Sequence, residues 1–105
     1  MAANIKPIFP DTPHVETGTG TVTFTGTTDG SRVDTVVLFN SGGGSNTQVI
    51  DIRYGTTILR RITVGALAAN AYTEEIMDKA IPNSGTINVT TADANIHISI
   101  FGGHY

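Results

Sequence analysis

The sequence has neither cysteine nor tryptophan among its 105 residues. Without cysteine the chain can form neither a disulfide nor a thiolate metal site, so both oxidising and reducing compartments remain open. Without tryptophan it lacks the broadest aromatic surface for stacking a sugar ring. The length allows one domain with one modest core.

Charge is also scarce. Charged residues make up 14% of the chain and its net charge is −3, whereas about 25% is typical of soluble proteins. The six Lys and Arg residues form no cluster, which argues against a nucleic-acid partner. A surface built from Thr, Ser, Asn and Gly instead favours contact with other proteins, although an extracellular β-protein would share this composition.

Long apolar runs are missing as well. None approaches the ~20 residues that cross a bilayer, so no membrane association is predicted. The first twenty residues lack the apolar core of a signal peptide. We therefore expect a protein that is made in the cytoplasm and stays there unless it leaves within a larger particle.

Proline is concentrated at one end, with three of the four prolines in residues 1–18. Proline removes a backbone donor and restricts its neighbour to extended geometry, so this segment is predicted to be an extended arm. The arm carries Ile5, Ile8 and Phe9, which a solvated tail would not need. These residues either fold back on their own core or dock on a neighbouring subunit.

Residues 19–105 are predicted to form a single β-domain. Apolar and polar residues alternate with period two in short segments separated by turns. The expected strands lie at 19–27, 32–40, 47–54, 57–64, 71–78, 86–91 and 95–101. Seven or eight such strands predict an all-β, antiparallel two-sheet β-sandwich of jelly-roll or immunoglobulin-like type. The final residues, 102–105, are expected to be a loose tail.

Glycine is abundant in "NSGGGSNTQ", residues 40–48. A phosphate-binding loop would end in Lys-Ser/Thr and lead into a helix. Here there is no lysine and a predicted strand follows, and neither flank is long enough for a separate domain. The segment is therefore interpreted as a mobile loop between two strands.

The segment "VIDIRYGTTILRRI" predicts a hairpin around a two-residue loop that opens with Gly55. The simplest register pairs Tyr54 with Thr57 and Asp51 with Arg60. It places Val49, Ile58 and Ile62 on the face away from the core. Apolar residues on an outward face predict an interaction surface, unless a bulge near the two arginines changes the register.

Residues able to support catalysis are dispersed. No two of the three histidines stand at a metal-ligand spacing. The adjacent Glu74 and Glu75 would point to opposite faces of a strand and could not act as a pair. No enzymatic activity, metal or cofactor is predicted; the enzymatic alternative would need a cleft holding His97 beside a serine or carboxylate.

Several segments together resemble small β-sandwich virion proteins of tailed bacteriophages. They are "VVLFN" before the glycine loop, the hairpin "IDIRYGTTIL", the turn and strand "ALAANAYTEEI" and the closing "ANIHISIFGG". The sequence departs from that pattern at "PNSGT", where a Gly-Asp turn is common. The resemblance implies a non-enzymatic virion component, such as a head decoration (cement) protein or a head–tail or tail accessory. Its expected partners are the major capsid protein or other virion proteins, and a homo-oligomer, most simply a trimer, is expected.

The competing interpretation is a carbohydrate- or receptor-binding module of a tail or fibre. It requires exposed aromatic side chains, for which Tyr54, Tyr72 and Tyr105 are the candidates.

Overall fold

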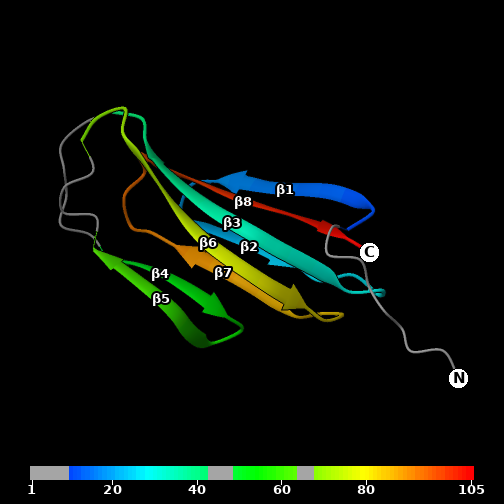
Figure 1. Ribbon diagram of the computed structural model, residues 1–105. Coiled ribbons are helices and arrows are strands. Elements are labelled where there is room, and N and C mark those ends of the chain that lie inside the picture. The colour runs from blue at the N-terminus through cyan, green and yellow to red at the C-terminus, as the bar shows by residue number, and fades with distance from the viewer. Residues whose placement is uncertain (1–9, 43–48, 64–67) are drawn as a thin grey trace, which may run out of the picture.

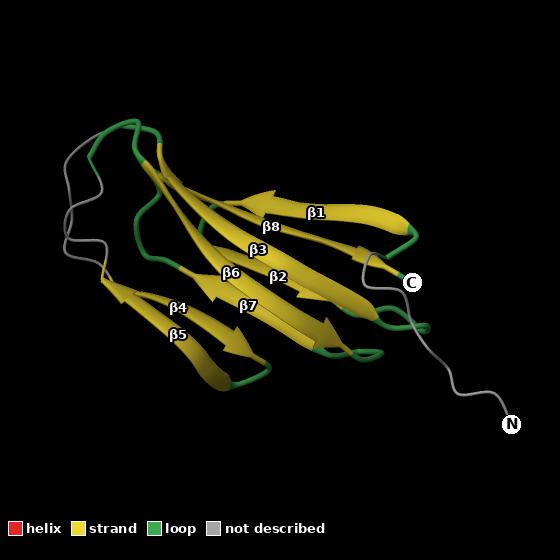
Figure 2. Ribbon diagram, viewed as in Figure 1, coloured by secondary structure: helices red, strands yellow, loops and turns green. Residues whose placement is uncertain are grey.

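The computed structural model describes residues 10–42, 49–63 and 68–105. They form eight β-strands and no helix (Figure 2), and so these residues include no helix that could cross a membrane. The strands are β1 (Thr12–Gly18), β2 (Thr21–Thr25), β3 (Ser31–Asn40), β4 (Val49–Tyr54), β5 (Thr57–Thr63), β6 (Tyr72–Ile81), β7 (Thr86–Thr90) and β8 (Ile96–His104).

The strands make two four-stranded antiparallel sheets that pack as a sandwich (Figure 1). Sheet A has the order β1-β8-β3-β6, and sheet B has the order β2-β7-β4-β5. The pairing is nested along the chain: β1 pairs with β8, β2 with β7, β3 with β6, and β4 with β5. This is the strand order of a jelly roll, so the predicted β-sandwich is confirmed and the immunoglobulin-like alternative is not adopted.

The core lies between the sheets and is built by period-two alternation. In β2, Val22 and Phe24 are buried between exposed threonines, and in β8 the isoleucines 96, 98 and 100 are buried. Burying each such side chain contributes about 1.5–3 kcal/mol. The remaining buried apolar residues are Val33, Val36, Leu38, Ile50, Ile52, Ile81, Ile87 and Val89.

Strand β3 lies inside sheet A, between β8 and β6. Its register with both neighbours shifts between Val33 and Thr35. The irregularity leaves Val33 and Val36 both buried, although they are three residues apart. A β-bulge changes the phase of the alternation in this way.

Both ends of the predicted domain need correction. Residues 12–18, assigned to the arm, form the edge strand β1, so the sandwich begins at Thr12 rather than at residue 19. The predicted tail is also part of the sheet. Gly102, Gly103 and His104 belong to β8, and the amide of Tyr105 donates a hydrogen bond to the carbonyl of Gly30. The proline and glycine content of these segments concealed their pairing.

The β4–β5 hairpin follows the prediction only at its tip. Tyr54 pairs with Thr57, and Gly55 has the positive φ of 59° that glycine adopts easily. The register then shifts, so Asp51 pairs with Arg61 instead of Arg60. Arg60 instead extends from β5 to β6 in the other sheet, where its Nε lies 3.9 Å from Oε2 of Glu75.

Candidate interaction surface

The exposed apolar side chains of the described residues gather mainly on one face. Seven large hydrophobic side chains are exposed, and five of them lie on the face of sheet A that points away from the core. We call this the outer face of sheet A. The five are Val15, Phe39, Tyr72, Ile76 and Phe101, of which Tyr72 and Ile76 are 65% and 66% exposed.

Strand pairing arranges this face in three rows that run across the sheet. The first row is Val15–Phe101–Thr35–Ile76, the second is Thr17–Ser99–Val37–Glu74 and the third is His97–Phe39–Tyr72. Successive rows stand about 6.7 Å apart, two residues along each strand. The first and third rows are apolar and aromatic, and the rings of Phe39 and His97 lie 6.4 Å apart.

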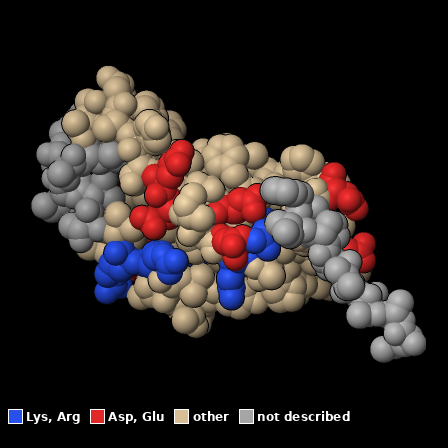
Figure 3. Space-filling view, viewed as in Figure 1, with Lys and Arg blue, Asp and Glu red and all other residues tan. Residues whose placement is uncertain are grey.

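Acidic side chains lie among these rows. Figure 3 shows carboxylates over β3 and β6, with basic groups beside them. Arg32 forms ion pairs with two of them, Asp34 and Asp78. Glu74 is exposed in the second row and has no ion-pair partner among the described residues. The face is therefore apolar in its first and third rows and carries a negative charge in the second row, on the edge strand β6.

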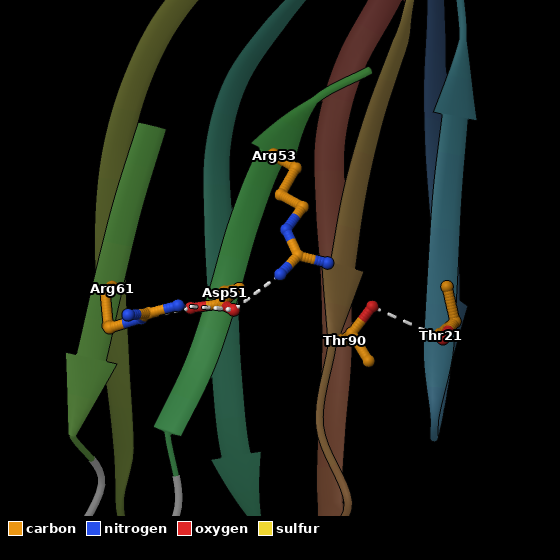
Figure 4. A network of polar contacts seen from close by, with 5 residues as sticks. All are labelled: Thr21, Asp51, Arg53, Arg61 and Thr90. Atoms are coloured by element: carbon orange, nitrogen blue, oxygen red, sulfur yellow. Dashed lines mark hydrogen bonds and ion pairs between the residues drawn. The ribbon is translucent and has the colours of Figure 1, made fainter. Parts of the chain in front are cut away.

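The outer face of sheet B is mostly polar. Asp51 accepts hydrogen bonds from Nε of Arg61 at 2.8 Å and from Nη2 of Arg53 at 2.9 Å (Figure 4). The hydrogen bond from Arg61 lowers the pKa of the Asp51 carboxyl. Nearby, Thr21 of β2 and Thr90 of β7 share a hydrogen bond of 3.3 Å between their hydroxyls (Figure 4).

The interface residues predicted from sequence are not brought together. Val49 and Ile58 are exposed on the outer face of sheet B, but the Asp51–Arg61 pair lies between them. Ile62 was predicted on that same face, and this is wrong. The register shift turns it inward, where it is half-buried and packs against the core. Ile5, Ile8 and Phe9 lie outside the described residues.

A histidine cluster occupies the end of the sandwich where β1, β3, β8 and β2 meet. The rings of His14 and His104 have centroids 4.6 Å apart, and each lies within 5.6 Å of the Phe24 ring. Glu16 accepts a hydrogen bond from Nε2 of His14 at 2.6 Å. Nδ1 of His104 and Oγ of Ser31 share one of 2.7 Å.

This cluster joins strands and does not expose a nucleophile. Ser31 is only 2% exposed, and its Oγ also accepts a hydrogen bond from the amide of Thr27. Burial lowers the pKa of His104, and the neighbouring His14 lowers it further while Glu16 opposes the shift. Among the described residues no group of three or more His, Cys, Asp or Glu side chains is placed to hold a metal ion.

Sequence reasoning missed most of the apolar face although its signal was present. In β8 the isoleucines point inward, so the alternation that turns His97 outward also turns Phe101 outward. In β3 the same rule turns Phe39 away from the buried Leu38. What the sequence could not provide was the strand order, which brings residues from four strands into the same rows.

No protein-family model matches this chain, and no curated protein and no solved structure matches it either.

Proposed function

We propose that this protein is a non-enzymatic structural component of a tailed-phage particle, most simply a head decoration protein. The observation that carries the proposal is the outer face of sheet A, where five exposed large apolar side chains share one surface. Contiguous apolar patches on soluble domains commonly mark sites of protein–protein contact. The jelly roll is compatible with this role because capsid domains use it, but lectins and enzymes use it too.

Decoration would work by selective binding to the assembled state. A protein that binds the assembled shell and not its free subunits stabilises the shell by mass action. The partner would be the major capsid protein or another virion protein, and the protein would reside in the virion after synthesis in the host cytoplasm.

The size of the face favours more than one point of attachment. Three rows over four strands cover roughly 20 by 20 Å, or on the order of 400 Å². A stable interface usually buries about 800 Å² on each partner. A homo-oligomer, with a trimer favoured, would multiply the contact and match the symmetry of a capsid site.

Co-sedimentation with phage particles tests the proposal. Mass spectrometry should find the chain in purified virions of the phage that encodes it, and added wild-type protein should sediment with particles that lack it. Ile76→Lys on the outer face of sheet A should weaken binding at least tenfold, because burying an unpaired charge is costly. Ile58→Lys, a matched change on the outer face of sheet B, should bind as the wild type does.

The outcomes separate the two faces. Loss of binding in Ile58→Lys alone would move the contact to the β4–β5 hairpin. Absence of the chain from virions, together with no co-sedimentation of the wild type, would reject the role.

A carbohydrate-binding function is the second candidate, because the third row aligns three rings. Phe39 lies between His97 and Tyr72 in register, and Tyr72 is exposed. Tyr54 is half-buried and packs against the core, so it no longer qualifies. A glycan screen in which Tyr72→Ala abolishes binding and Val49→Ala does not would favour this function.

A further inference from the structure

We propose that residues 1–9 bind across the outer face of sheet A of their own chain and cover its apolar rows before assembly. The occupant of this face is thus a segment of the protein itself. This inference deepens the proposed function, because it states what occupies the same face in the isolated protein.

The first observation is where the chain enters the sheet. Gly103 follows Phe101 by two residues in β8, so a side chain at Gly103 would point to the same outer face. A Cβ placed there would lie 2.8 Å from Cβ of Pro10, so the proline ring rests on that position. Gly103 is buried as a result. Pro10 therefore lies over this end of the outer face of sheet A, and the preceding residues start from there.

The second observation is that residues 1–9 are long enough to cross the outer face of sheet A. From Gly103 the row of Phe101 lies about 7 Å away and the row of Phe39 and His97 about 20 Å away. Nine extended residues span at most about 30 Å. A segment tethered at Pro10 therefore reaches all three rows of its own sheet, and the short tether gives it an effective concentration on the order of millimolar.

The third observation is complementary chemistry. Residues 1–9 read MAANIKPIF, with apolar Ile5, Ile8 and Phe9, one lysine and no acidic residue. Along β6 the outer face presents Tyr72, Glu74 and Ile76. Lys6 can therefore meet the carboxylate of Glu74 while the apolar residues cover the rows on either side of it.

Disulfide trapping tests this inference, because the chain has no cysteine of its own. The test variant carries Asn4→Cys in the arm and Ser99→Cys in the second row, both replacing polar residues so that the apolar contacts remain. The matched control pairs Asn4→Cys with Thr23→Cys, an exposed strand position on the outer face of sheet B. Both are oxidised at low protein concentration and analysed by non-reducing electrophoresis and light scattering.

We expect the test pair to close within one chain at least tenfold faster than the control. Lys6→Glu should slow closure, and Glu74→Lys added to Lys6→Glu should restore it. Equal rates in test and control would overturn the proposal. Disulfides formed only between chains would overturn it too and assign the face to the arm of a second copy. Because the isolated protein is used, failure here leaves the particle-binding result for the proposed function unchanged.

Discussion

At the scale of single residues, Gly102 shows how closely two inner strands of sheet A approach. A Cβ at this position would lie 2.0 Å from the carbonyl oxygen of Arg32, which belongs to the backbone of β3. A backbone atom cannot rotate away as a side chain can. The close contact between β8 and β3 therefore depends on the absence of a side chain here.

We expect Gly102→Ala to lower the free energy of unfolding by about 3 kcal/mol, the upper end of the usual cost of overpacking, since the strands must separate to admit the methyl group. Urea denaturation followed by circular dichroism measures the change. Gly18→Ala is the control, because its Cβ would meet only the end of the Val22 side chain, at 3.2 Å. Equal destabilisation of the two variants would contradict the prediction.

The histidine cluster makes stability depend on pH. In the unfolded chain His104 gains its proton near pH 6.5, whereas burial in the fold lowers its pKa. Between the pKa of His104 in the fold and its value of 6.5 in the unfolded chain, the unfolded state binds more protons than the folded state. The free energy of unfolding therefore falls as the pH decreases through this range, and the contribution of neutral His104 is fully present above it. Between pH 7.5 and about pH 4.5, we expect the free energy of unfolding to fall less for His104→Gln than for the wild type, as measured by urea unfolding curves.

The interpretation needs a control, because His14 and Glu16 face His104 and carboxylates elsewhere also titrate. His97→Gln removes a histidine from the same strand at an exposed position. If His104→Gln and His97→Gln show the same pH dependence, His104 is not its source.

At the scale of elements, the β4–β5 hairpin depends on its turn. Gly55 has a φ of 59°, and a Cβ added to it would meet nothing within 4 Å, so conformation rather than space restricts this position. A side chain in the left-handed region costs roughly 1–2 kcal/mol, most for β-branched residues and less for asparagine. We expect Gly55→Val to destabilise by about that amount and Gly55→Asn by less than half of it, as measured by urea denaturation. A larger effect of asparagine would show that the turn has another conformation.

Strand β3 offers a second test, because its adjacent residues Leu38 and Phe39 lie on opposite faces of the sheet. Leu38 is fully buried, whereas Phe39 is 36% exposed on the outer face of sheet A. We expect Leu38→Ala to cost about 2–5 kcal/mol, since it removes packed core atoms and leaves a cavity. Phe39→Ala should cost less than about 1 kcal/mol in a chain lacking residues 1–9, where no arm covers the outer face. Similar losses for the two variants in thermal unfolding of that shortened chain would contradict the outward orientation of Phe39, whereas a larger loss for Phe39→Ala in the full chain is what arm docking requires for the third row.

Alternation in the sequence predicts most elements, and its failures have physical causes. The strands around Phe24, Leu38 and Ile98 were predicted because one face of each is buried and the other is not. The register of β5 could not be predicted, because one extra residue in a bulge inverts every later side chain, including that of Ile62. Strand β1 was missed because its only partner in the sheet, β8, lies far along the chain, and local sequence does not reveal that pairing.

At the scale of the whole molecule, the two ends of the described sandwich support each other. β1 covers one edge of β8, whereas Pro10 and Asp11 belong to no strand. The outer face of sheet A could be predicted only in part, because strand order is not visible in the sequence. The apolar face combines residues from four strands, and only the strand order reveals that Val15, Phe101 and Ile76 share a row.

Two truncations separate the arm from the sandwich. Removal of residues 1–9 should preserve a cooperative thermal transition, since all eight described strands remain. Removal of residues 1–18 deletes β1 and uncovers the backbone of β8, so we expect a lower melting temperature and aggregation detectable by light scattering. If removal of residues 1–18 leaves the melting temperature unchanged, β1 does not contribute to the fold as its pairing indicates.

The nested pairing also determines when sheet A can form during synthesis. β8 leaves the ribosome after every other strand, yet it lies inside the sheet, between β1 and β3. Until it emerges, β1 has no partner in its own sheet and β3 has only β6. Thr12 pairs with His104 although most of the chain separates them in sequence. Pairs of this kind give the fold a high contact order, which is typical of proteins that fold in milliseconds to seconds. A nascent chain stalled before β8 would expose the unpaired edges of β1 and β3, and unpaired strand edges of this kind favour aggregation during synthesis.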